Sequence, residues 1–148
     1  MCNNKKESDC NCIAEILTVI NILQQNAECS ENCLDTCDRG FLGCGASSLV
    51  CNTRPVMLYT CCGNGTPWKM PISKENINCN TASDASCSSV FRIEKLDGNC
   101  ATFRVLATNT DPATAATTPY VATNSFFTMD LNCLCVIRCL QDTAVECV

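Results

Sequence analysis

Seventeen of the 148 residues are cysteine, and the chain contains no histidine. No two cysteines stand at C-x-x-C spacing, which most thiolate metal sites and dithiol redox sites use. Disulfide formation is therefore the chemistry that the cysteines favour. Because seventeen is odd, at least one thiol must stay free, bind something or pair with another molecule. Disulfides between chains are the leading hypothesis.

The absence of histidine also argues against an enzyme. Ser-His-Asp, Cys-His and His-metal arrangements need an imidazole, and histidine is the usual general base near neutral pH. Glu94, Asp97 and Asp130 remain, but a solvated strand face or a turn explains each of them. The short G-x-G pieces lack the Lys-Ser/Thr ending of a phosphate-binding loop. We predict no catalytic residues.

A thiolate metal site is the main alternative. The C-x-C pairs Cys10/Cys12 and Cys133/Cys135 resemble fragments of metallothionein-like sequences. Metallothioneins lack a hydrophobic core, however, whereas this chain has enough Ile, Leu, Val, Phe and Met to build one. The chain also lacks the regular spacing that preorganises a tetrahedral site. We expect no metal and no cofactor, and a metal-binding or redox-buffering protein is the second hypothesis.

Length, charge and hydropathy indicate which partners and which compartment of synthesis are favoured. A chain of this length is about one domain and does not need disulfides merely to fold. The net charge of −5 disfavours nucleic acid and anionic membranes as partners. No apolar run is long enough to span a bilayer, and no secretory signal follows the N-terminus. We expect cytoplasmic synthesis and later oxidation, which weighs against a third hypothesis, a secreted disulfide-stapled binding module.

The first element that must position these thiols is a helix from Asp9 to Asn26, with Asp9 or Asn11 as its N-cap. Apolar residues at helical spacing should face the core: Ile13, Ile16, Leu17, Ile20 and Leu23. Gln24 falls elsewhere on the helical wheel, with the other polar residues. The apolar stripe is therefore expected to be buried and the polar residues solvated.

A second, short helical stretch is predicted from Cys29 to Cys37. Cys29, Cys33 and Cys37 recur every four residues, so in a helix the three thiols line one face. Their Cβ atoms would lie about 5–6 Å apart, further than the ~3.8 Å of a disulfide. They should therefore bond to other segments or other chains. The alternative is three buried cysteines that act as small apolar residues.

From Gly40 onward, short β-prone runs alternate with Gly, Ser, Thr and Asn, which is typical of antiparallel β-structure. The predicted strands are Arg54–Thr60, Val90–Leu96, Cys100–Ala107 and Ser125–Leu140, the last one bent in its middle, with a turn at Cys61–Gly65 and a surface loop at Thr108–Pro119. We predict a mainly β fold. It is an antiparallel β-sandwich-like domain with one N-terminal α-helix and a short second helical segment.

The clearest hairpin is built on Asp-Gly-Asn at residues 97–99. We predict a three-residue loop here rather than a two-residue Asp-Gly loop, because the longer loop pairs apolar residues on one face. In that register Ile93 faces Phe103, Phe91 faces Val105 and Arg92 faces Arg104. The two arginines carry like charges, and Glu94 at the diagonal position could relieve their repulsion.

Alternation on the last strand, Phe127–Cys139, predicts that Cys133 and Cys135 project from the same face as Leu131 and Ile137. Their spacing of about 6.6–6.8 Å along a strand is too long for a bond between them. Each therefore needs a cross-strand or cross-chain partner. Cys61 and Cys62 should also have separate partners, because a bond between neighbouring residues demands a strained ring.

Residues 1–12 are predicted to form a flexible, cysteine-containing arm, and residues 13–148 a single self-assembly domain. Thiols near chain ends reach neighbouring molecules, so the candidates for disulfides between subunits are Cys2, Cys10, Cys12 and Cys147. Further disulfide candidates, within or between subunits, are Cys29, Cys33, Cys37, Cys133, Cys135 and Cys139. Several such bonds per subunit would convert weak contacts into practically irreversible ones.

Four segments of the chain resemble one known family. They are C-N-C-I-A-E-I-L from Cys10, N-T-R-P-V-M-L-Y-T from Asn52, F-R-I-E-K-L-D-G-N-C-A-T from Phe91 and M-D-L-N-C-L-C-V-I-R-C-L from Met129. The chain is similar, over most of its length, to the cysteine-rich spore coat proteins Y and Z and exosporium protein Y of Bacillus-type spore formers. The last segment is the most specific, because that family typically ends with an acidic residue, a C-x-C strand and a third cysteine.

The resemblance implies a structural protein of the spore crust or exosporium. Such a protein assembles with itself, as hexamers that tile a hexagonal two-dimensional sheet, and with other spore coat or exosporium proteins. Disulfides between subunits harden the sheet. Family members are made in the mother-cell cytoplasm without a signal peptide and become oxidised on the spore surface when that cell lyses. This chain departs from the family pattern in its lack of histidine and its larger number of cysteines.

Overall fold

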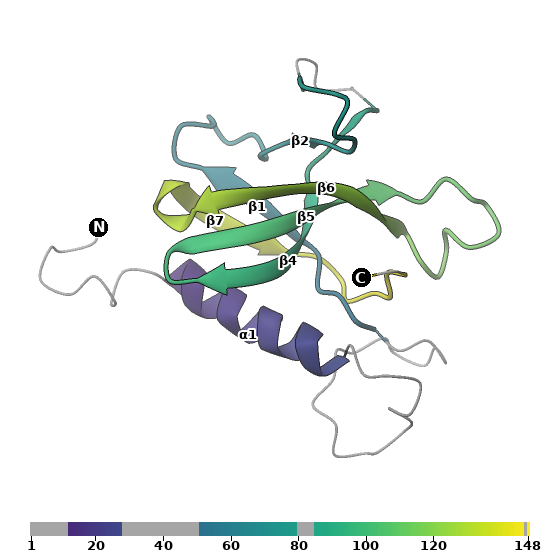
Figure 1. Ribbon diagram of the computed structural model, residues 1–148, viewed down its shortest axis with the longest axis horizontal. Coiled ribbons are helices and arrows are strands. Elements are labelled where there is room, and N and C mark those ends of the chain that lie inside the picture. The colour runs from purple at the N-terminus through teal and green to yellow at the C-terminus, as the bar shows by residue number, and fades with distance from the viewer. Residues whose placement is uncertain (1–11, 28–50, 80–84, 147) are drawn as a thin grey trace, which may run out of the picture.

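The computed structural model describes residues 12–27, 51–79, 85–146 and 148 (Figure 1). Their elements are α1 (Cys12–Ala27), β1 (Val56–Thr60), β2 (Met70–Pro71), β3 (Cys87–Ser88), β4 (Val90–Asp97), β5 (Cys100–Thr108), β6 (Tyr120–Asp130), the 3-10 turn η2 (Leu131–Cys133) and β7 (Leu134–Cys139). The prediction of a mainly β, antiparallel fold with an N-terminal α-helix is confirmed. The predicted helical stretch Cys29–Cys37 and the candidate caps Asp9 and Asn11 lie outside the described residues.

A five-stranded sheet with the strand order β6-β5-β4-β1-β7 forms most of the fold, and β2 and β3 make a separate two-stranded sheet. The edge strands β6 and β7 follow each other in the chain, joined only by η2. In a flat sheet the two edges would lie about 19 Å apart, because neighbouring strands are about 4.8 Å apart. The four residue steps from Asp130 to Leu134 span at most about 14 Å. The sheet must therefore curl, which brings the end of β6 to the beginning of β7.

The curled sheet and α1 enclose one hydrophobic core. Phe91, Phe103 and Phe127 from three neighbouring strands form its aromatic centre, with ring centroids 4.8–6.4 Å apart. Ile13, Leu17 and Ile20 of α1 are buried and belong to the same core. Strands β1, β4, β5, β6 and β7 all contribute buried side chains to it. One sheet thus supplies the facing β surfaces that the sandwich-like prediction required.

Two positions of α1 differ from the prediction. Ile16 was expected in the core but is 40% exposed, whereas Gln24, expected among the solvated residues, is 1% exposed. The Gln24 side-chain amide donates to the Ile93 carbonyl at 2.8 Å and accepts from the Arg54 backbone N–H at 3.1 Å. Buried backbone groups that the sheet leaves unpaired need such partners. Gln24 therefore joins the helix to β4 and to the segment that precedes β1, a role that apolar periodicity cannot reveal.

The hairpin between β4 and β5 has the predicted core register, with Ile93 opposite Phe103, Phe91 opposite Val105 and Arg92 opposite Arg104. The three-residue loop was wrong, because Asp97 pairs with Cys100 and only two residues form the loop. A bulge at Glu94 shifts the register by one residue and so restores the predicted pairs beyond it. Gly98 has a φ of 57°, which suits a tight hairpin turn.

The predicted role of Glu94 is confirmed. One carboxylate oxygen of Glu94 accepts from Arg92 at 2.9 Å and from Arg104 at 3.0 Å. The side chain of Arg92 is only 1% exposed and also donates to the Thr53 hydroxyl at 2.9 Å and the Asn52 carbonyl at 3.2 Å. The buried guanidinium is thus compensated by one carboxylate and by neutral acceptors.

The bend predicted within Ser125–Leu140 is η2, but its effect on the inward face was missed. Leu131 and Leu134 are buried, whereas Cys133 and Cys135 are exposed, so the prediction that both thiols share a face with Leu131 was wrong. The 3-10 turn breaks the alternation of the strand. A bulge at Cys135, where Tyr59 pairs with Val136 and Thr60 with Leu134, then returns Ile137 to the core.

Candidate functional site: exposed thiols around the turn η2

The cysteines are the only residues that the sequence singled out for chemistry. Disulfides join Cys61 to Cys135 and Cys79 to Cys87, and Cys51 is also disulfide-bonded. In the described part of the chain the free cysteines are Cys12, Cys62, Cys100, Cys133 and Cys139, all of them exposed. Seven cysteines lie outside that part: Cys2, Cys10, Cys29, Cys33, Cys37, Cys44 and Cys147. The structure therefore places Cys12, Cys133, Cys135 and Cys139 among the predicted candidates.

Three of the free thiols, Cys62, Cys100 and Cys133, gather around η2, and we call them the thiol cluster. Cys62 follows Cys61, whose backbone N–H donates to the Cys133 carbonyl at 3.0 Å. Cys100 pairs with Asp130, the N-cap of η2. The Leu131 N–H donates at 2.8 Å to the carbonyl of Asn99, the residue before Cys100. Curling of the sheet thus brings together the ends of β1, β5 and β6 (Figure 1), next to which these three cysteines lie in the sequence.

Backbone geometry sets the position of Cys61 and Cys62. They open a tight turn in which Asn64 and Gly65 have φ values of 53° and 79°. This left-handed region is open to glycine and tolerated by asparagine. A Cβ atom at Gly63 would lie 3.0 Å from the Thr60 hydroxyl oxygen, so a larger residue would push against the end of β1. The C-C-G-N-G sequence therefore turns the chain sharply next to the Cys61–Cys135 disulfide.

A groove of about 420 Å³ lies beside the Cys61–Cys135 disulfide. Its walls include both bonded cysteines, Tyr59, Asn64 and the half-exposed Val136, and none of its lining residues is charged. Cys61 and Cys135 are themselves exposed. A disulfide in this position is open to attack by a thiolate from outside the subunit.

Cys139 lies at the other end of β7, where it pairs with Val56 near the ion pair of Arg54 and Asp142. Arg54 binds the Asp142 carboxylate through two nitrogens at 2.7 and 2.9 Å. Partial desolvation raises the pKa of the Cys139 thiol above its ordinary value of 9.0, Arg54 lowers it and Asp142 raises it. The net shift is upward, so the thiol form persists to higher pH.

We predict a pH dependence for Cys139 from this shift. Only the thiolate reacts with iodoacetamide, and less than about a tenth of a thiol with a pKa above 9.0 is ionised at pH 8. Alkylation of Cys139 should therefore be slower at pH 8 in the folded chain than in urea, and should rise steeply above pH 9. Timed alkylation followed by peptide mass spectrometry measures this. Equal rates at pH 8 in the folded and unfolded chain would contradict the prediction.

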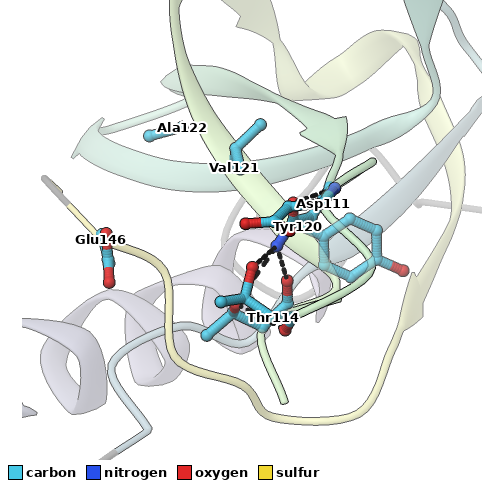
Figure 2. Close-up of a pocket in the computed structure, with 8 residues that line it drawn as sticks. Asp111, Thr114, Tyr120, Val121, Ala122 and Glu146 are labelled. Carbon is cyan, nitrogen blue, oxygen red and sulfur yellow. Dashed lines mark hydrogen bonds between the residues drawn. The ribbon is translucent and has the colours of Figure 1, made fainter. Parts of the chain in front are cut away.

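A second hollow lies at the predicted surface loop (Figure 2). Tyr120, Asp111 and Glu146 are among its lining residues. The side-chain amide of Asn109, which also lines the hollow, is hydrogen-bonded within the loop. It donates to the Thr114 hydroxyl at 3.0 Å and to the Thr118 carbonyl at 2.7 Å. These bonds hold the loop in shape. The hollow contains no cysteine, so it contributes nothing to thiol chemistry.

Among residues 12–27, 51–79, 85–146 and 148, no group of three or more His, Cys, Asp or Glu side chains is arranged to hold a metal ion. Within the same ranges, no helix has both the length and the hydropathy required to cross a membrane.

Sequence reasoning did not select Cys100 as a disulfide candidate. It expected separate partners for Cys61 and Cys62; Cys61 bonds to Cys135, whereas Cys62 is free within the chain. A signal for Cys100 was present, because it directly follows the Asp-Gly-Asn hairpin turn and such turns project from a sheet. Cys62 lies in a turn that the sequence did predict. Neither signal shows that the two turns meet at η2, because that depends on how the sheet curls.

A β-domain with a complete core and many exposed thiols has the features of a structural subunit that can be cross-linked. The family model for spore coat protein Z matches residues 1–142. The chain therefore belongs to the spore coat protein Z family, and it is a structural protein of the bacterial spore coat, at the spore surface. No curated protein and no solved structure matches the chain significantly.

Proposed function

We propose that this protein assembles with itself into a hexagonally packed two-dimensional layer of the crust or exosporium, hardened by disulfides between subunits. The observation that carries the proposal is that the described part of the chain has five exposed free thiols, none of which belongs to its hydrophobic core. Thiols spread over several elements let one subunit bond to several neighbours. Subunits joined by head-to-tail contacts would close into hexameric rings. These hexamers would tile the layer together with other coat or exosporium proteins.

The cysteines near the two ends of the chain complete this proposal. Cys12 is exposed at the first residue of α1. Cys2, Cys10 and Cys147 lie outside the described residues, and we propose that all four form disulfides between subunits. Synthesis in the mother-cell cytoplasm without a signal peptide would keep the thiols reduced until the subunits are in place. Oxidation at the spore surface would then make the layer resistant to heat and denaturant.

Negative-stain electron microscopy of the recombinant chain, with gels run with and without reductant, tests the proposal. Ordered sheets that survive boiling and run as the 16.0 kDa monomer only after reduction are expected. Reductant should weaken the sheets without unfolding the subunit, because the core does not depend on the thiols. A discrete monomer that binds zinc or copper would instead establish the metal-binding alternative.

Substituting Cys2, Cys10, Cys12 and Cys147 together by Ser should weaken the sheets in the same direction as reductant. A matched control replaces Cys79 and Cys87, which bond to each other within the chain, and should leave the intersubunit ladder on the gel unchanged. If the fourfold variant formed sheets as resistant as those of the parent, the role assigned to these four thiols would be wrong.

A further inference from the structure

The Cys61–Cys135 disulfide differs from the other described disulfide in its surroundings. Both of its cysteines are exposed, and it borders an uncharged groove. Free thiols flank both sides of the bond in the chain, Cys62 directly after Cys61 and Cys133 two residues before Cys135. Cys79 and Cys87 are half-buried instead, and the Cys87 sulfur lies 3.6 Å from the Asn78 carbonyl oxygen. Only the first bond combines access with neighbouring free thiols.

Opening the Cys61–Cys135 bond would leave the sheet in place. Strands β1 and β7 are paired from Val56–Cys139 to Thr60–Leu134, with one bulge at Cys135, so backbone hydrogen bonds hold them together without the disulfide. Neither cysteine belongs to the hydrophobic core. The fold thus permits this bond to be exchanged in the assembled subunit.

We propose that the Cys61–Cys135 disulfide is an exchange site through which two copies of this chain become covalently linked. This proposal rests on the proposed assembly function. A thiolate of the thiol cluster of one copy attacks the Sγ atom of Cys61 or Cys135 in a facing copy. A new S–S bond forms between the chains, the Cys61–Cys135 bond breaks, and the released cysteine leaves as a thiolate that takes up a proton. The number of disulfides is unchanged, so the step consumes no oxidant.

A second copy is the occupant that the structure favours at the groove. The attacking thiols and the bond under attack lie around the same turn η2, so a two-fold contact between identical surfaces would present each to the other. The groove carries no charge that would repel an identical neighbour, and the half-exposed Val136 offers it apolar surface. The released thiolate remains exposed and can be oxidised later, when the layer hardens.

The test mixes two forms of the chain without oxygen and with a metal chelator. The tagged form is the parent, and the untagged form carries Cys61→Ser and Cys135→Ser but keeps the thiol cluster. We expect interchain disulfides from Cys61 or Cys135 of the tagged chain to Cys62, Cys100 or Cys133 of the untagged chain. The total number of free thiols should stay constant. Non-reducing peptide mass spectrometry locates the bonds.

Two matched variants of the tagged chain test whether the cross-links depend on the Cys61–Cys135 disulfide. Removing Cys61 and Cys135 should lower anaerobic cross-linking at least about tenfold but leave cross-linking in air. Removing Cys79 and Cys87 should change neither. Cross-links that form only in air, or that arise only within one chain or away from Cys61 and Cys135, would overturn the exchange site while keeping the proposed function. No cross-links even in air would overturn both.

Discussion

Replacing Glu94 by Gln is expected to lower the free energy of unfolding by about 3 kcal/mol. The substitution keeps the shape of the side chain but removes the negative charge that pairs with both Arg92 and Arg104. Arg92 is 1% exposed and cannot recover its hydration, and the two guanidinium groups then face each other across the strands. Such a loss corresponds to a fall of about 6–12 °C in the melting temperature.

Asp142→Asn is the matched control, because it also removes a carboxylate from an arginine. Arg54, its partner, is 31% exposed, so water can replace the lost charge and the expected cost is about 1 kcal/mol or less. Urea unfolding of the reduced chains, followed by circular dichroism, measures both variants without intersubunit disulfides. Equal losses for the two variants would show that the buried position of Arg92 does not matter.

The second large effect is expected for Phe103→Ala, at about 4 kcal/mol of unfolding free energy. Phe103 is fully buried and contacts the rings of Phe91 and Phe127, at centroid distances of 6.4 and 5.3 Å. Removing its ring leaves a cavity that three strands and α1 cannot fill without moving. The loss should therefore exceed the transfer free energy of the ring alone.

Phe126→Ala provides the comparison on the neighbouring surface. Phe126 is 40% exposed and lies 4.6 Å beneath the Arg104 guanidinium, a contact whose loss should cost less than about 1 kcal/mol. The same urea titration measures both variants. If Phe126→Ala cost as much as Phe103→Ala, the aromatic centre would not be the main source of stability in the subunit.

Both expectations concern a subunit whose stability comes from its core and its buried ion pair. The free thiols of the described residues lie outside this core, around η2, at the beginning of α1 and at the end of β7. Substitutions in the core should therefore change unfolding, whereas substitutions of exposed cysteines should change assembly. This separation allows the roles of the cysteines to be tested in chains that still fold.

Local patterns in the sequence were sufficient for the helix, for most of the five-stranded sheet and for the core register of the hairpin, but they missed β2, β3 and the first residues of β6. Apolar residues at helical spacing predicted α1, and the Asp-Gly-Asn turn located the β4–β5 hairpin because these signals act over a few residues. They also predicted that Glu94 offsets the facing arginines. The loop length was missed because the bulge at Glu94 shifts the register between the loop and the core.

The tertiary structure alone decided which thiols meet and which stay exposed. Cys61 and Cys135 are 74 residues apart in sequence, and no local pattern links such distant positions. Their bond follows from the pairing of β1 with β7, and the thiol cluster follows from the short turn η2 between the two edges of the sheet. The sequence by itself determined that this chain has more thiols than its fold needs. Where they lie depends on the curl of the sheet, because closure of the edges is a property of all five strands together.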